Sequence, residues 1–207
     1  MTEIHSYDPR TGHGLRHDPL NAIVAPRPIG WISTTSAAGV RNLAPYSFFN
    51  LFNYKPPIIG FCSTGWKDSV RNIEETGEFV WNLATRPLAQ AVNATSAIVP
   101  DHVDEFALAG LTPAASQRVQ APRVAESPVA FECRLTQMVR LNDVEGAPVD
   151  AWLTLGEVLM VHIDQALLID GVYDTVAAEP ILRGGGAGDY FGIDEAGKFQ
   201  MFRPESA

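Results

Sequence analysis

Six short runs of apolar, aromatic and β-branched residues constrain this chain more than any other feature. They are separated by Gly, Pro and Asp residues and span 28–35, 40–49, 57–63, 78–84, 129–141 and 150–163. Runs of this kind are typical of strands in an antiparallel sheet or barrel. The last two are long and are joined by the turn-like NDVEGAP, which predicts a hairpin. The predicted core residues of its second strand are Leu153, Leu155, Val158 and Met160.

Between these runs the sequence predicts a few short helices. KDSVRNIEETG offers Asp68 or Ser69 as an N-cap and Gly77 as the end of a helix. TRPLAQAVNATS carries Pro87 in its first turn, and VDEFALAG is a third candidate. The segment 111–128 contains several Pro residues and no clear period, which is typical of a surface loop. We therefore expect a mainly β fold with short flanking helices.

The charge balance disfavours several classes of protein. A formal net charge of -9 argues against a nucleic-acid binder, which needs a basic face to displace counterions from phosphates. No apolar run is long enough to cross a membrane, and the first residues are polar rather than signal-like. We therefore expect no binding to nucleic acid or membrane, and a cytoplasmic location.

The cysteine and histidine residues suggest neither a disulfide scaffold nor a metal site. Cys62 and Cys133 each lie in an apolar, strand-like run, where a thiol behaves as a small hydrophobe. The five histidines lack the spacing of metal ligands. No metal is predicted.

The length predicts a single domain over residues 1–207. A polar leader arm is expected over 1–18 and a glycine-rich arm over 184–207. Tyr190 and Phe191 follow the glycines at once. Both a packed C-terminal arm, across a dimer interface, and a disordered one fit this pattern.

The segment FCSTGWKDSVRN has the features of an anion site. A strand ends near Ser63 and a helix opens near Ser69, so unpaired amides at the helix start carry partial positive charge. The Lys67 ammonium and the Arg71 guanidinium add cations to the same region. The spacing does not match a P-loop. An ordinary capped helix with Lys67 in solvent fits the same residues.

A second polar group lies on the two preceding strand runs, PRPIGWISTT and SAAGVRNLAPYSFFN. Pro45 cannot donate a ladder hydrogen bond, so its strand is expected at an edge or a bulge with free backbone groups nearby. Free backbone groups beside short polar side chains suit a planar heterocycle, although such side chains also decorate solvent faces and turns. These side chains belong to Ser33, Thr34, Thr35, Asn42, Ser47 and Asn50.

Several segments together resemble a known family. In chain order they are PRPIGWIST, NLAPYSFFN, KDSVRNIEETGEFVWNL, NATSA, VDEFALAGLT, PRVAESPVAFEC and GEVLMVHI, between about residues 17 and 190. Their order and density are similar to those of the flavin reductase-like family of FMN-binding split-barrel proteins. The resemblance implies a six-stranded antiparallel split barrel with Greek-key connections, forming a homodimer with FMN near the subunit interface.

The resemblance also implies which residues bind FMN. The phosphate would lie on Ser63, Lys67, Asp68 and Ser69. The ribityl chain and ring would meet Ser33, Thr34, Pro45, Ser47, Phe48 and Asn50, with Asn93 and Ser96 closing the groove. Many relatives have a small or basic residue where this chain has Trp66, so charge neutralisation would rest more heavily on Lys67.

The activity implied is hydride transfer from NAD(P)H to flavin, with reduced flavin passed to a partner oxygenase. Flavin supplies the redox chemistry, so no side chain is predicted to be catalytic. An open apolar patch beside the ring is expected, and its candidates are Phe48, Trp66, Tyr190 and His162. His162 is also read as a structural residue. An FMN electron carrier and a flavin-dependent oxidase or oxygenase remain alternatives.

Overall fold

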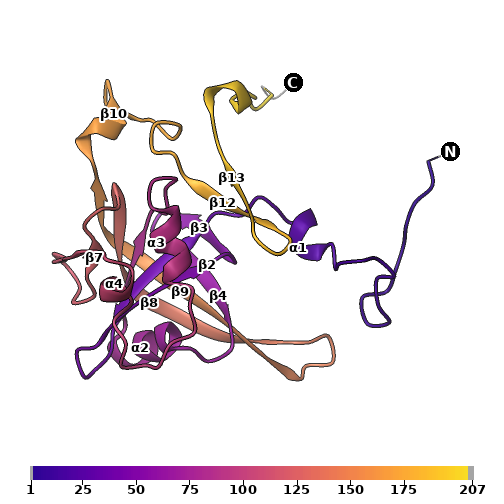
Figure 1. The fold of residues 1–207 in the computed structure, drawn as a ribbon, viewed down its shortest axis with the longest axis horizontal. Helices are drawn as coiled ribbons and strands as arrows, with labels where there is room; N and C mark the ends of the chain where they lie inside the picture. Colours follow the sequence, from indigo (N-terminus) through magenta and orange to yellow (C-terminus); the bar gives the residue numbers. More distant parts are fainter. Residues whose placement is uncertain (1, 205–207) are drawn as a thin grey trace.

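The computed structural model describes residues 2–204 and contains one large antiparallel sheet of seven strands (Figure 1). The strands lie in the order β2-β1-β5-β8-β9-β4-β3. Their bounds are β1 Gly30–Thr35, β2 Arg41–Tyr46, β3 Phe49–Tyr54, β4 Pro57–Thr64, β5 Glu78–Asn82, β8 Val129–Asn142 and β9 Pro148–Ile163. The predicted strand runs are thereby confirmed as elements of one antiparallel sheet.

The two edge strands of this sheet, β2 and β3, are consecutive in the chain. A bend at Ser47 and Phe48 separates them, and the Cys62 N–H donates to the Phe48 carbonyl at 2.8 Å. The stretch therefore pairs with β1 through its first half and with β4 through its second half, which closes the sheet into a barrel. Counted once, this bent stretch gives the six strands that were predicted. Pro45 lies on the edge strand β2, where a missing donor is tolerated.

The core residues predicted for β9 are only partly confirmed. Val158 is buried as expected, but Leu153, Leu155 and Met160 are only half-buried, and Thr154 and Gly156 take inner positions beside Val158. A Cβ atom on Gly156 would overlap the ring of Phe79. The absence of that atom lets Phe79 fill the barrel interior, so the face with the glycine, not the one with the leucines, is the inner one.

The helices are few and short, as predicted. They are α1 Leu20–Ile23, α2 Asp68–Thr76, α3 Ala89–Ala94 and α4 Glu105–Leu108, with 3-10 turns η1 Gln165–Leu167 and η2 Glu195–Gly197. The N-cap of helix α2 is Lys67, not Asp68 or Ser69 as predicted, so the helix begins one or two residues earlier. Gly77 ends it in the left-handed conformation at φ 74°, and its N–H donates to the Ile73 carbonyl.

Three small ribbons accompany the large sheet. The predicted loop 111–128 carries one of them, and the other two lie after η1 and in the C-terminal arm. The pairs are β6 Pro113–Ala114 with β7 Arg123–Val124, β10 Leu168–Ile169 with β11 Val172–Tyr173, and β12 Ile181–Gly185 with β13 Asp189–Gly192.

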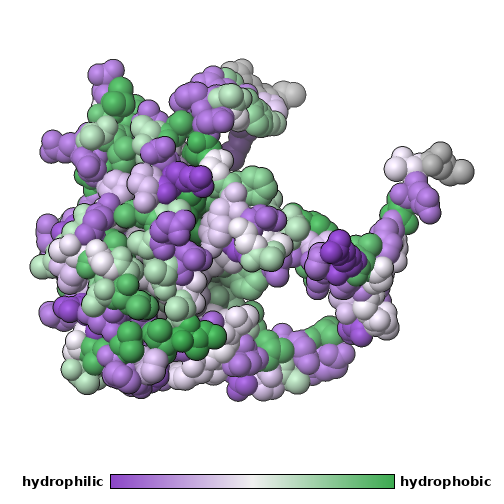
Figure 2. Space-filling model, viewed as in Figure 1, coloured by the Kyte–Doolittle hydropathy of each residue, from purple (hydrophilic) through white to green (hydrophobic). Residues whose placement is uncertain are grey.

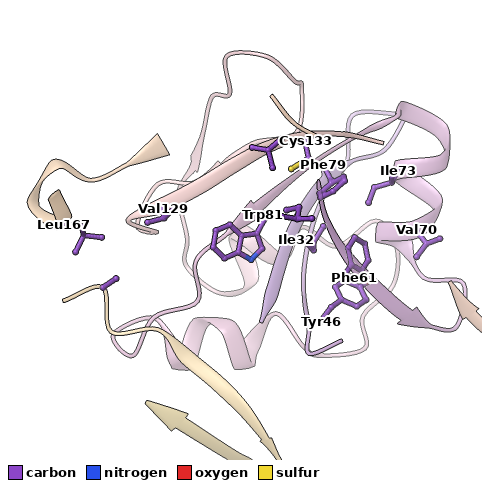
Figure 3. Packing of buried hydrophobic residues seen from close by; sticks show 13 residues of the cluster. Ile32, Tyr46, Phe61, Val70, Ile73, Phe79, Trp81, Val129, Cys133 and Leu167 are labelled. Carbon is purple, nitrogen blue, oxygen red and sulfur yellow. The ribbon is translucent and has the colours of Figure 1, made fainter. Parts of the chain in front are cut away.

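An aromatic cluster fills the barrel between the sheet and α2 (Figure 3). The Phe61 ring lies 4.5 Å from the Tyr46 ring and meets the Phe79 ring edge-on at 6.0 Å. Val70 and Ile73 bring the inner face of α2 into this cluster. Large aromatic side chains dominate core energetics, so this cluster fixes the start of α2 against β2 and β4.

The two arms differ in how they meet the body. The N-terminal arm leads away from the barrel (Figure 1). The C-terminal ribbon of β12 and β13, in contrast, is attached to the body, since Arg183 and Arg27 exchange backbone hydrogen bonds at 2.8 and 3.0 Å. The arms were predicted to include residues 1 and 205–207, which lie outside the described residues. Within 2–204, no helix has the length and apolar character needed to cross a membrane.

Candidate functional site

A cavity of about 260 Å³, here named the α2 cavity, lies where β2, the start of α2 and the loop after α3 meet. Five residues that were predicted to bind FMN line it, namely Pro45, Lys67, Asp68, Ser69 and Ser96. Its other lining residues are Ala44, Tyr46, Thr95, Ala97, Ile98, Val99 and Glu105. Segments far apart in the sequence thus form one recess lined by both polar and apolar residues.

The start of α2 provides the recess with free donors. Lys67 has extended backbone angles at the N-cap position, and its side chain does not cap the helix. Within residues 2–204, the amides of Asp68, Ser69 and Val70 donate no hydrogen bond. Unsatisfied amides at a helix start attract anions. The structure therefore has the anion-site geometry that the segment FCSTGWKDSVRN predicted.

Of the charged residues that line the cavity, Asp68 is ion-paired. The Arg71 guanidinium lies 2.5 Å from the Asp68 carboxylate, also contacting Asp101 at 3.9 Å. In the part of the chain that the structure describes, Lys67 forms no ion pair. The Lys67 ammonium group would thus be available to pair with an anion in the α2 cavity.

Tyr46 lines the same cavity and was not predicted as a site residue. Its side chain is 7% exposed, and among the described residues its hydroxyl oxygen has no hydrogen-bond partner. Burial raises the pKa of Tyr46, and the nearby hydroxyls of Ser69 and Ser63 oppose that shift. A buried polar atom without a partner is costly, so a ligand or water is expected to satisfy it. The only sequence signal was its place inside NLAPYSFFN.

Three predicted hydroxyls serve the fold instead of the cavity. The Ser33 hydroxyl donates to the Pro122 carbonyl at 2.5 Å. The Thr34 hydroxyl accepts a hydrogen bond from Asn72 at 3.0 Å, and the Ser63 hydroxyl donates to the Gly65 carbonyl at 2.9 Å. All three side chains are fully buried. None of the three lines the α2 cavity, although the Ser63 hydroxyl lies near that of Tyr46.

A second cavity, of about 570 Å³, lies beyond the bend between β2 and β3. Phe48 and Asn50 line it together with Arg27 and Cys62. The Arg27 guanidinium lies 5.5 Å from the centre of the Phe48 ring, and its Nε donates to the Ser47 carbonyl at 3.1 Å. Arg27 was not predicted, although it belongs to the quoted segment PRPIGWIST. The predicted ring-binding residues Ser47, Phe48 and Asn50 are therefore grouped around one arginine.

The other predicted residues lie elsewhere. Asn93 and Tyr190 line a third cavity, of about 600 Å³, between α3 and the β12–β13 ribbon. The Trp66 ring meets the Trp152 ring edge-on at 4.5 Å. His162 lies 2.6 Å from the Glu132 carboxylate, which supports the structural reading of this histidine. The four candidates for one apolar patch are thus distributed over separate places.

Comparisons with known proteins agree with this fold. The model of the flavin reductase like domain matches residues 24–177. An uncharacterized protein of Aquifex aeolicus is 38% identical over 151 residues, covering 70% of this chain and 74% of that protein.

Solved structures extend the likeness. The nitrilotriacetate monooxygenase component B from Bacillus cereus has a TM-score of 0.86 at 29% identity, covering 97% of this chain and all of that one. The flavoredoxin of Desulfovibrio vulgaris has a TM-score of 0.75 at 23% identity, covering 86% of this chain and 91% of that one, a likeness of fold alone. Because the family model covers most of its length, the chain belongs to the flavin reductase-like family of FMN-binding split-barrel proteins.

Proposed function

We propose that this chain is an NAD(P)H-dependent flavin oxidoreductase that holds FMN by its phosphate in the α2 cavity. The observation that carries the proposal is the uncapped start of α2, where the free amides of Asp68 and Ser69, the Lys67 ammonium and the Ser69 hydroxyl belong to residues that line one recess. Membership of the flavin reductase-like family supports a flavin as the ligand. Use of NAD(P)H, which is abundant in the cytoplasm, fits a cytoplasmic location.

The residues of the recess suit a phosphate group. Lys67 and the α2 amides supply positive charge, while Ser69 and Tyr46 supply hydroxyl donors; the Ser96 hydroxyl donates to the Asn93 carbonyl instead. A volume of about 260 Å³ lies below the range of roughly 300–1,000 Å³ that is usual for a whole ligand of this size. We therefore assign the phosphate and the adjoining part of the ribityl chain to the α2 cavity.

The flavin ring would then lie along the bend of the edge strand, toward the second cavity. Pro45 leaves that backbone without one donor, and Ser47 and Asn50 present short polar side chains beside it. Arg27 fixes the bend through the Ser47 carbonyl. When bound, FMN supplies the hydride and electron chemistry, and the protein's residues bind it, orient it and limit access to it.

We further propose that the protein is a homodimer. Leu51, Phe52 and Tyr54 of β3 are more than half exposed. Hydrophobic atoms also interrupt the polar surface along the protruding β8–β9 hairpin, where Val139 and Leu141 are exposed (Figure 2). Apolar surface of this extent is typical of an interface. A second copy would cover it and border the second cavity, which shares Phe52.

The likeness to a component of a monooxygenase supports a partner oxygenase as the acceptor of reduced flavin. This assignment requires that FMN exchange with solvent. Consumption of NADH or NADPH that rises hyperbolically with added FMN is the expected result. If instead the purified protein holds a yellow chromophore that neither nucleotide bleaches, the chain is an electron carrier.

The binding site is tested with Lys67→Ala. Losing a charge-assisted contact to phosphate is expected to weaken FMN binding by about 1–3 kcal/mol, roughly 5- to 150-fold in Kd. Calorimetric titration with FMN measures the change. Lys198→Ala is the control, because Lys198 pairs with Glu195 in the C-terminal arm. Equal affinities of the two variants would contradict the assigned phosphate site.

A further inference from the structure

Glu105 brings a carboxyl group to the wall of the α2 cavity. It is the first residue of α4 and is 5% exposed, and its Oε2 accepts a hydrogen bond from the Leu43 N–H at 3.1 Å. The cavity has the donors of a phosphate site, yet a negatively charged carboxylate would repel a phosphate.

The charged groups packed around Glu105 leave it without a cation of its own. On β2 and α4, Arg41 is engaged by Asp104 at 2.7 Å. On α2, Arg71 is engaged by Asp68 at 2.5 Å. Within residues 2–204, no ion pair includes Glu105. Lys67 is the cation left in the cavity, and a bound phosphate would engage it.

Two carboxylates line the cavity, and they differ in whether a cation neutralises their charge. Asp68 is neutralised by Arg71, whereas Glu105 is buried and accepts its hydrogen bond from a neutral amide. Burial raises the pKa of Glu105; the Leu43 and Glu105 amides oppose the shift, and Asp68 and Asp104 add to it. Burial thus makes the neutral, protonated form of Glu105 easier to reach than that of an exposed glutamate.

A phosphate in this small cavity would lie within about a Debye length, roughly 8–10 Å, of the Glu105 carboxylate. Like charges at that distance repel, whereas a protonated carboxyl group repels no anion and adds an O–H donor. We propose that binding of the phosphate group takes up one proton from solvent at Glu105, which makes this residue the determinant of pH-dependent cofactor affinity. The inference rests on the proposed function.

The sign follows from linkage. Because bound phosphate raises the pKa of Glu105 further, the Kd for FMN is expected to rise with pH between the pKa of the free protein and that of the complex. Within this window the change is up to about tenfold per pH unit. Riboflavin, which lacks the phosphate, is expected to show no such dependence on Glu105.

The test compares Glu105→Gln with the wild-type protein by titration with FMN from about pH 5 to about pH 9. Glutamine keeps an acceptor for the Leu43 N–H but carries no proton to exchange. The pH dependence is expected to flatten in this variant, with tighter FMN binding than wild type at the alkaline end. The ionisation of the phosphate itself is common to both proteins, so the ratio of their Kd values isolates Glu105.

Glu126→Gln is the matched control, because Glu126 also accepts a backbone hydrogen bond, from Thr112, but lies outside the cavity. A second measurement is calorimetry in two buffers of different ionisation enthalpy: the wild-type protein should take up more protons with FMN than Glu105→Gln does, because any proton change of the phosphate is common to both, and riboflavin should show no such difference. Parallel pH profiles for wild type and Glu105→Gln, or equal proton uptake by the two proteins with FMN, would overturn the role of Glu105. Absence of FMN binding at every pH would overturn the proposed function as well.

Discussion

Replacement of Glu132 by alanine should destabilise the fold strongly. This carboxylate is fully buried and accepts hydrogen bonds from the Gln117 N–H at 2.9 Å, the Arg118 N–H at 2.6 Å and His162 at 2.6 Å. Each hydrogen bond to a charged group contributes about 1.5–3 kcal/mol, which sets an upper bound of about 9 kcal/mol. Because residues 117 and 118 are exposed, water can partly satisfy their amides. We therefore expect a loss of about 3–5 kcal/mol, the range for breaking a buried pair.

Urea unfolding of the wild-type protein and of Glu132→Ala measures this difference as a change in the free energy of unfolding. Glu132→Gln keeps one acceptor oxygen and similar volume, so its loss should be smaller than that of Glu132→Ala. A loss below about 1 kcal/mol for the alanine variant would refute the reasoning, since surface substitutions already reach about half of that.

Acid gives a second readout of the same group. Although burial raises the pKa of Glu132, hydrogen bonds from Gln117, His162 and Arg118 outweigh it and hold the pKa below its ordinary value. Its contribution is then complete above the unfolded-state pKa, near 4.3, and is lost as pH falls through the lower folded pKa. The wild-type protein should thus lose more stability on acidification than Glu132→Gln. Parallel losses would contradict this sign.

Two further predictions concern packing and assembly. Gly156→Ala would place a methyl group against the buried Phe79 ring, and it should lower the free energy of unfolding in urea by about 1–3 kcal/mol. Gly188→Ala is the control, because a methyl group there has open space. Equal stability of the two variants would contradict the packing. Sedimentation velocity should give the mass of a dimer, and Tyr54→Lys should shift it toward the monomer; a monomeric wild-type protein would rule out the proposed interface.

The sequence predicted the elements and the strand-to-helix junction at the start of α2 because both depend on local signals. The strand runs are bounded by turn residues, and α2 ends at Gly77 as its sequence indicates. Burial was harder to predict for β1, where Ser33 and Thr34 are both buried although they alternate along the strand. Alternation separates core from solvent only where one face of a sheet is open, and here both faces are covered: Asn72 of α2 contacts Thr34 on one face, and the loop at Pro122 contacts Ser33 on the other.

The sequence did not predict which residues from distant segments contribute to the α2 cavity. Glu105 and Tyr46 reach the α2 cavity from elements that lie far apart in the sequence, and neither residue type signals a phosphate site by itself. Leu153 and Leu155 of β9 were predicted to be buried, whereas an inner position is held by Gly156, which has no side chain that an apolar pattern would register. Long-range packing, not propensity, decides such positions.

The covalent continuity of β2 and β3 ties the two ends of the sheet together. Within residues 2–204, the sheet therefore has no free edge from which strands can separate one after another. Separation of β2 from β1 also strains β3, which continues directly from β2 and pairs with β4. A ligand spanning the Ser47–Phe48 bend would therefore protect amides on both sides of it at once. Hydrogen-exchange rates in β2 and β3 should fall together when cofactor is added, as one opening unit rather than two.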